Sequence, residues 1–264
     1  MTDAIIQLVL GWLGLLVAAV LAVLILALTV LARRYPTRPR VLRPITAFQR
    51  LPITVGQAVE TGRRLHIALG TGELGTADTT TTVAGLTLLD QISAAAAVSD
   101  RPPVVTTSDG ATLLLAQDTL RNVYTRQNAL ARYDQDSAQV AGLTPLAYGA
   151  AQTALPADEA VAGAVLLGTV GSEAVLLAEA GQRAGVTTLA GADGLATQAM
   201  LFTTADHPLL GEDVFAGAAY IGGEPQHLAS LSAQDVARVA IAVLIVLGVL
   251  VQSARVLVPS LFPF

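Results

Sequence analysis

The sequence predicts an α/β domain with a mostly parallel sheet, placed between two terminal transmembrane helices. Three observations lead to this fold class. The chain is 53% hydrophobic and only 13% charged, whereas soluble domains carry roughly one quarter charged residues. The apolar excess gathers near the two ends of the chain. The middle alternates short apolar runs with longer segments of helical periodicity, which is typical of strands joined by helices.

The first 33 residues are predicted to form a transmembrane helix. No charge occurs between Asp3 and Arg33, and this run exceeds the roughly 20 residues needed to cross a bilayer. A cleaved signal peptide fits less well, because its positively charged start is missing and Arg33-Arg34 follows the apolar run. The helix is therefore expected to remain as an anchor.

Residues 34–50 are predicted to form a basic linker next to the membrane. Six arginines and no acid follow the first helix: Arg33, Arg34, Arg38, Arg40, Arg43 and Arg50. Basic residues of this kind mark the cytoplasmic side of a membrane. The domain that follows is therefore predicted to be cytoplasmic, with both termini of the two-pass chain outside.

Residues 51–231 are predicted to form the α/β domain, because strand and helix patterns alternate between glycine, proline and aspartate residues. In its first half we expect strands over 65–69 and 103–107 and helices over 79–98 and 110–127, the latter capped by Asp109. In its second half we expect strands over 161–167, 186–189 and 198–203 and helices over 172–184 and 209–221. Ser172 is the expected N-cap of the helix over 172–184, and Gly185 ends that helix. Two strand-Gly-Thr-helix corners, at Gly70 and Gly168, suggest a Rossmann-like sheet with a weak internal repeat.

A second transmembrane helix is predicted over 232–256, followed by a short apolar tail over 257–264. Val239–Val251 is wholly apolar and lies between Arg238 and Arg255. The preceding Ser232-Ala-Gln-Asp235 matches a capping box, which places the helix start at Ser232. A re-entrant or interfacial position remains an alternative to a full span.

The stretch Gly70-Thr-Gly-Glu-Leu-Gly75 has the G-x-G-x-x-G spacing of dinucleotide-binding loops. Such loops also need a helix directly after the third glycine and an acid about 20 residues further on. Here a threonine-rich run separates Gly75 from the helix, and the acids nearest the required spacing, Asp90 and Asp109, fit poorly. A structural turn is therefore favoured over a phosphate site. If a ligand does bind, the candidate residues are Gly70, Thr71, Gly72, Gly75, Thr79, Gly168, Gly171 and Ser172.

Other residues give no catalytic or metal site. The chain has no cysteine and no lysine, which excludes thiol nucleophiles, P-loops and Schiff bases. Four polar residues lie close together in sequence, but their spacing fits an acidic helix start better than a metal site: Asp206, His207, Glu212 and Asp213. His66 is expected to be a half-buried residue of its strand. No catalytic residue, metal or cofactor is predicted.

The charge balance disfavours nucleic acid as a partner. Residues 51–237 contain nineteen acids and seven arginines, a net charge near −12, and this would repel phosphate groups. The expected partners are the lipid bilayer and other copies of the chain or subunits of a larger membrane complex. Gly14, Ala18 and Ala22 form a ridge of small residues on the first helix, which favours close helix packing.

Several short stretches resemble landmarks of an uncharacterised bacterial membrane-protein family with one α/β domain between terminal helices. They are Gly62–Gly72, Gly168–Glu173, Gly211-Glu212 with Ala219-Tyr220, and Ser230–Asp235. The resemblance implies the bacterial inner membrane as location and supplies no activity. The sequence therefore predicts a scaffold or assembly subunit without a catalytic site. The alternative is a membrane-anchored sensor or enzyme that binds a small ligand or nucleotide at the Gly70–Gly75 loop.

Overall fold

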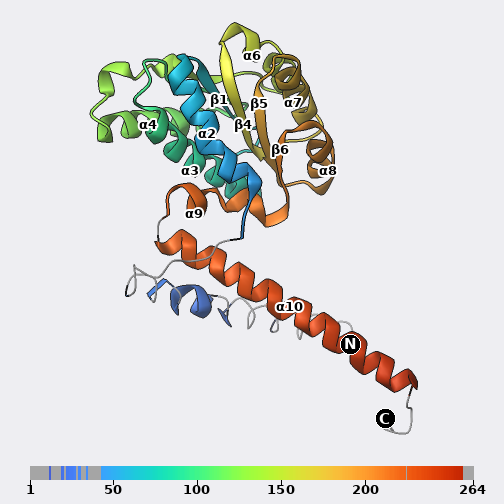
Figure 1. Cartoon of the computed structure of the whole chain (residues 1–264). Helices are drawn as coiled ribbons and strands as arrows, with labels where there is room; N and C mark the ends of the chain where they lie inside the picture. Colours follow the sequence, from blue (N-terminus) through green and yellow to red (C-terminus); the bar gives the residue numbers. More distant parts are fainter. Residues whose placement is uncertain are drawn as a thin grey trace. The chain divides into compact units, whose positions relative to one another are not determined.

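The computed structural model describes residues 12, 19–20, 22–27, 29–30, 34, 43–223 and 225–257. The chain divides into two compact units, and one of them, Arg43–Gly222, is an α/β domain. The other unit consists of the two terminal segments, and its main described element is the long helix α10, Pro225–Leu257. Figure 1 shows the elements of the domain along the chain.

Six parallel strands form the single sheet of the domain, in the order β3-β2-β1-β4-β5-β6. This is the strand order of doubly wound, Rossmann-type sheets, so the predicted α/β class and parallel sheet are confirmed. The strands are β1 (Arg64–Gly70), β2 (Val104–Thr107), β3 (Ala138–Val140), β4 (Val161–Thr169), β5 (Thr187–Ala192) and β6 (His207–Leu209).

Helices cover both faces of the sheet (Figure 1). One face carries α2 (Thr46–Thr61), α3 (Thr79–Ala96) and α4 (Gly110–Arg126), and α9 (Gly217–Ile221) packs against α3 and α2. The other carries α5 (Pro145–Gln152), α7 (Ala174–Arg183) and α8 (Leu195–Thr204), and the short α6 (Leu155–Asp158) leads into β4. Three short 3₁₀ turns complete the domain: η1 (Leu130–Arg132), η2 (Gln135–Ser137) and η3 (Gly211–Phe215).

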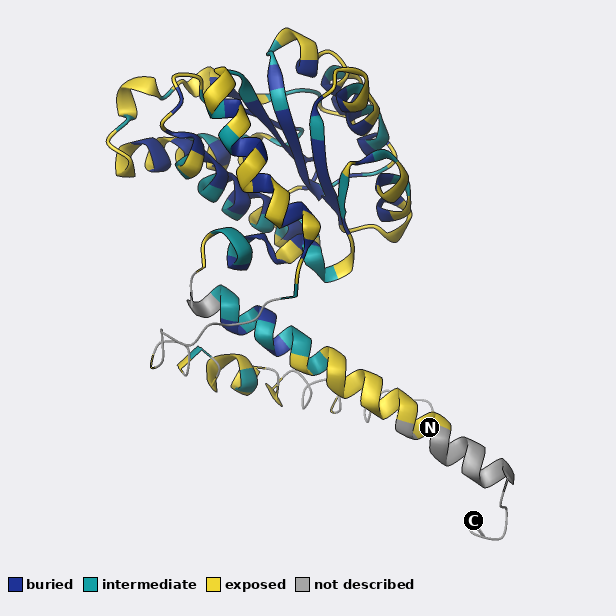
Figure 2. Cartoon of the chain, viewed as in Figure 1, coloured by how far each residue is buried: buried dark blue, intermediate teal, exposed yellow. Residues whose placement is uncertain are grey.

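The sheet is the most deeply buried part of the domain, as the dark strands of Figure 2 show. Every residue of β1 from Leu65 to Gly70 is buried, and β4 is buried along nearly all its length. Strands covered on both faces are expected to be apolar throughout, which explains why the sequence patterns located β1, β2, β4 and β5.

The strand predicted over 198–203 is wrong, because these residues lie in α8. Thr197, Gln198 and Leu201 are buried while Phe202 is exposed, a spacing that fits one face of a helix. A helix is also what the parallel pairing of β5 with β6 requires, since the chain must cross over between them. The helix predicted over 209–221 is interrupted in the same region, where β6 is followed by η3 and α9.

The domain begins earlier than predicted, because residues 43–50 belong to it rather than to a basic linker. Arg43 forms an ion pair with Asp213, and Arg50 lies in the first turns of α2. Their place in the sequence, directly after the first predicted span, hid this structural role. Arg34 is exposed, and the remaining arginines of the predicted linker lie outside the described residues.

Helix α10 begins at Pro225, ahead of the predicted start at Ser232. The Ser232 hydroxyl donates to the carbonyl of Leu228 inside the helix, so it is not an N-cap. Within the described residues, His227–Val246 is the one stretch long and apolar enough to cross a membrane by length and composition. The first predicted span lies mostly outside those residues, including Gly14 and Ala18, whereas Ala22 is exposed on a helical stretch.

Candidate functional site

The first candidate site is the carboxyl edge of β1 and β4. These two strands are neighbours, and the strand order reverses between them. Ligands of open α/β sheets bind in the crevice at such a switch point. The register places Gly70 opposite Thr169, so the fold brings together the two Gly-Thr corners that are far apart in sequence.

The two corners are bonded to each other rather than open to a ligand. The Thr71 amide donates to the Thr169 carbonyl at 2.8 Å, and the Thr71 hydroxyl donates to the same oxygen at 3.1 Å. The Gly70 amide donates to the Tyr148 hydroxyl at 3.1 Å. The Gly171 amide donates to the Glu173 carboxylate at 2.7 Å. These three backbone amides are therefore bonded to oxygens of the protein itself and are not free to hold a phosphate.

The glycines of the first corner allow the backbones of the two corners to lie close together. Gly70 has φ +82°, and a Cβ there would overlap the carbonyl of Thr169. A Cβ at Gly72 would lie 2.7 Å from the Thr82 hydroxyl and 3.1 Å from the Thr169 side chain. These glycines are needed because the backbone of one corner packs on the other.

The remaining candidate residues do not complete a phosphate site. Helix α3 begins at Thr79, whose hydroxyl accepts from the Gly75 amide at 2.8 Å, so Gly75 lies outside the helix as the sequence suggested. Ser172 is exposed and is not the N-cap of α7; that position belongs to Glu173. The side chain of Glu173 folds back to the Gly171 amide and makes no cap bond.

The two acids considered as partners of a ribose hydroxyl, Asp90 and Asp109, each have another partner in the protein. Asp90 lies on α3 and pairs with Arg126 at 2.5 Å. Asp109 caps α4 as predicted, accepting from the Thr112 amide at 2.8 Å. Partial burial raises the pKa of Asp109, but hydrogen bonds from Thr112 and the amides of α4 outweigh it and lower the pKa below its ordinary value.

A buried polar network lies beneath the first corner. His66 was expected to be half-buried and is instead fully buried. Its Nε2 lies 2.9 Å from the Thr106 hydroxyl, which also lies 3.3 Å from the hydroxyl of Tyr148 and 3.2 Å from the amide nitrogen of Gln152. Burial lowers the pKa of His66 to about 4 and raises that of Tyr148 to about 12. Both groups are therefore neutral near pH 7, and the network joins α5 to the sheet.

Three of the four polar residues predicted in the later half, Asp206, His207 and Asp213, line one cavity together with Arg43. The Asp206 carboxylate accepts from the Thr188 amide at 2.8 Å, and His207 lies in β6. Asp213 pairs with Arg43, and Glu212 lies 3.8 Å from the same guanidinium. Within the described part of the chain, no group of three or more histidine, aspartate or glutamate side chains could hold a metal ion.

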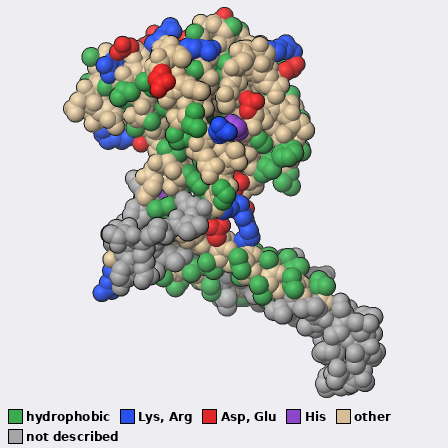
Figure 3. Space-filling view, in the orientation of Figure 1, with side chains coloured by type: hydrophobic (Ala, Val, Ile, Leu, Met, Phe, Trp, Pro, Cys, Tyr) green, Lys and Arg blue, Asp and Glu red, His purple; other side chains and the backbone are tan. Residues whose placement is uncertain are grey.

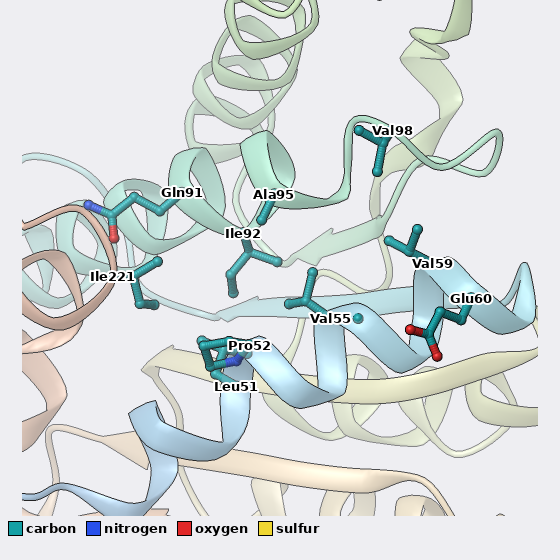
Figure 4. A pocket seen from close by; sticks show the side chains of 11 residues that line it. Leu51, Pro52, Val55, Val59, Glu60, Gln91, Ile92, Ala95, Val98 and Ile221 are labelled. Atoms are coloured by element: carbon teal, nitrogen blue, oxygen red, sulfur yellow. The ribbon is translucent and has the colours of Figure 1, made fainter.

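The second candidate site is an apolar groove of about 380 Å³ between α2 and α3, which we call the α2–α3 groove. Figure 4 shows side chains of α2 pointing toward those of α3 across it, with Ile221 at one end and Val98 at the other. Its lining residues are Leu51, Pro52, Val55, Gly56, Val59, Glu60, Gln91, Ile92, Ala95, Val98 and Ile221. No sequence pattern predicted this groove, because it depends on the separation of two helices.

The family of the chain follows from a comparison of its sequence. A family described as "Domain of unknown function (DUF6754)" matches residues 7–261. The chain belongs to this family. The match covers the α/β domain and both terminal segments, and the family description names no activity. No curated protein and no solved structure matches the chain.

The hydrogen bonds at the carboxyl edge of β1 and β4 lead to a prediction about dinucleotide binding. We expect NAD, NADP and FAD to show no binding below the millimolar range, because the amides of Gly70, Thr71, Gly75 and Gly171 already have acceptors in the protein. Isothermal titration of the full chain in mild detergent measures this. A micromolar dissociation constant that is lost on the change Gly72→Val would show that the corners open to admit a ligand.

Proposed function

We propose that the protein is a scaffold or assembly subunit of a membrane complex, in which the α/β domain makes protein contacts and carries out no chemistry. The observation that carries this proposal is the closed switch point. The crevice that usually holds the ligand of such a sheet is bridged by the bonds of Thr71 to Thr169. A domain without an open crevice there is better suited to binding surfaces than to converting substrates.

Membrane anchoring is part of the proposal. From Arg238 onward, the described side chains of α10 are exposed (Figure 2), and they include seven large apolar residues. These are Val239, Ile241, Val243, Leu244, Ile245, Val246 and Val249. Because the apolar residues surround the helix rather than forming one stripe, a bilayer is a better environment for it than water. We propose two passes through a bacterial inner membrane, with the domain in the cytoplasm.

Self-assembly is the contact we favour. Large apolar side chains are exposed where β3 and β5 end: Leu143 and Leu195 are each 81% exposed and Leu146 is 73% exposed. All three follow the carboxyl ends of their strands, so they belong to the edge at which related folds hold a ligand. Charged groups of both signs are scattered over the face in Figure 3, with no large basic cluster among its described residues. These features support protein contact over binding of a phosphate backbone.

The proposal predicts a particle larger than one protomer after extraction in mild detergent. We expect Leu146→Asp combined with Leu195→Asp to reduce its mass, because charges at a buried contact are not tolerated. Ala18→Phe should act similarly through the first helix, where close packing of small residues would be lost. Light scattering coupled to size exclusion measures the mass.

Phe202→Asp is the matched control, because Phe202 is 61% exposed on the same helix as Leu195 but near its opposite end. It should leave the mass unchanged. A monomeric wild-type particle contradicts self-assembly. A large particle unaffected by these changes contradicts the proposed surfaces and shifts the choice toward other subunits as partners.

A further inference from the structure

We infer that the α2–α3 groove binds the alkyl chain of a membrane lipid. This inference rests on the membrane anchoring proposed above. The groove has the size of a small-molecule pocket, and its walls are formed almost entirely by aliphatic side chains. Leu51, Val55 and Val59 recur every four residues along one wall, and Ile92 and Ala95 face them from the other (Figure 4).

The lining has one charged residue, and it lies at an end. Glu60 is exposed at the last turn of α2, and no ion pair is recorded for it among the described residues. Its carboxylate can therefore remain in water while the groove is filled. The wall of α2 from Leu51 to Glu60 is about 13.5 Å long at 1.5 Å per residue. An uncharged, flexible alkyl chain matches this narrow apolar space.

The opposite end of the groove lies where the domain is joined to the terminal segments. The Tyr220 hydroxyl donates to the carbonyl of Arg43, the first residue of the domain. The rings of Tyr220 and Phe48 stack with centroids 5.4 Å apart. Phe48 precedes Leu51 by one helical turn, and Tyr220 precedes Ile221. Both connections therefore leave the domain beside the Leu51 and Ile221 end of the groove.

This position favours a lipid as the occupant. Helix α10 begins four residues after Ile221, and this helix contains the candidate membrane span. In a membrane-anchored chain, the six residues from Ile221 to His227 keep this end of the groove within about 20 Å of the start of the candidate span, and lipid chains are an abundant apolar ligand at such a position. Burying methylene groups in such a groove is favourable, roughly in proportion to the apolar area covered.

Two segments of the chain are poorer occupants. Residues 35–42 contain Arg38, Arg40 and two prolines, so their charges would have to enter an apolar space. The tail over 258–264 follows α10, which is one helix of 33 residues and about 50 Å long. Seven residues span about 25 Å at most, which is about half the length of that helix, so the tail is too short to run back along it.

Gly56 provides a variant that fills the groove without disturbing the fold. It lines the groove, and a Cβ built there meets no atom within 4 Å. Gly56→Phe should therefore place a ring in the groove. The matched control is Gln57→Phe, since Gln57 is exposed on the same helix and does not line the groove.

The test uses the full chain reconstituted in phosphatidylcholine vesicles that contain a phospholipid with a photoactivatable diazirine in its acyl chain. After illumination, mass spectrometry maps the lipid adducts. We expect adducts on residues 51–60 and 91–98 as well as on α10. Gly56→Phe should reduce the groove adducts at least fivefold and leave those on α10 unchanged, and Gln57→Phe should reduce neither. Equal resistance to trypsin verifies that both variants fold.

The outcomes separate this inference from the proposed function. Adducts on α10 without adducts in the groove overturn the lipid site and leave the membrane anchor in place. An absence of adducts on α10 overturns membrane anchoring itself. Groove adducts that persist in Gly56→Phe, labelling by a free diazirine fatty acid but not by the phospholipid, or a cross-linked peptide of this or another protein in the groove would each contradict a membrane lipid as occupant.

Discussion

Replacing Gly168 with alanine is expected to lower the free energy of unfolding of the α/β domain by about 4 kcal/mol. Gly168 lies in β4, the strand beside β1 at the centre of the sheet. The pairing of these strands has an irregularity between Ala68 and Gly70, and there a Cβ on Gly168 would overlap the carbonyl of Leu69. Backbone atoms cannot rotate away as a side chain can, so the two strands would have to separate.

Pulse proteolysis in urea measures this loss on the full chain in detergent. Gly110→Ala and Gly56→Ala are matched controls, because a Cβ at either position meets no atom within 4 Å. Gly56 is in the middle of α2, where alanine should be neutral or stabilising by up to about 1 kcal/mol. A loss below about 1 kcal/mol for Gly168→Ala would show that β1 and β4 are less tightly apposed than described.

The second expected result is a loss of stability in mild acid that depends on His66. The pKa of this buried side chain is about 4 in the folded protein, against about 6.5 when unfolded. The unfolded chain therefore binds a proton that the folded domain excludes, and stability falls as the pH decreases from about 6.5 to about 4. At pH 4.5 the loss attributable to His66 is about 2.5 kcal/mol relative to pH 7.5.

The change His66→Gln tests this assignment, because glutamine can bond the Thr106 hydroxyl but does not titrate. Free energies of unfolding of both proteins should be measured at pH 7.5 and pH 4.5. The decrease between the two pH values should be about 2.5 kcal/mol smaller in the variant. Equal decreases would show that other groups account for the acid sensitivity.

Much of the sheet could be predicted because its strands are apolar runs between strong turn residues. The strand and helix from Leu65 to Ala96 and the cap at Asp109 lie where the pattern placed them. The three-residue strands β3 and β6 gave no such signal. Helix α2 was missed because its first turns contain Arg50, which also fits the predicted basic linker, and α8 because its apolar run is too short to show a period.

The candidate sites were predictable to different degrees. The corners at Gly70 and Gly168 were found by their residue types, and the strand order explains why they meet. Their closure could not be predicted, because it depends on the bonds of Thr71 to Thr169 and on Tyr148 and Glu173, which enter from α5 and from the start of α7. The α2–α3 groove depends on how two helices diverge, and periodicity in one helix does not contain that information.

The hydrogen bond from Tyr220 to the carbonyl of Arg43 also has a mechanical meaning. It joins the two ends of the α/β domain, so the domain is a loop-like insertion that begins and ends at one place. Tension applied through the two terminal segments would act across this junction and its stacked rings. The junction would therefore carry the load before the ladder between β1 and β4.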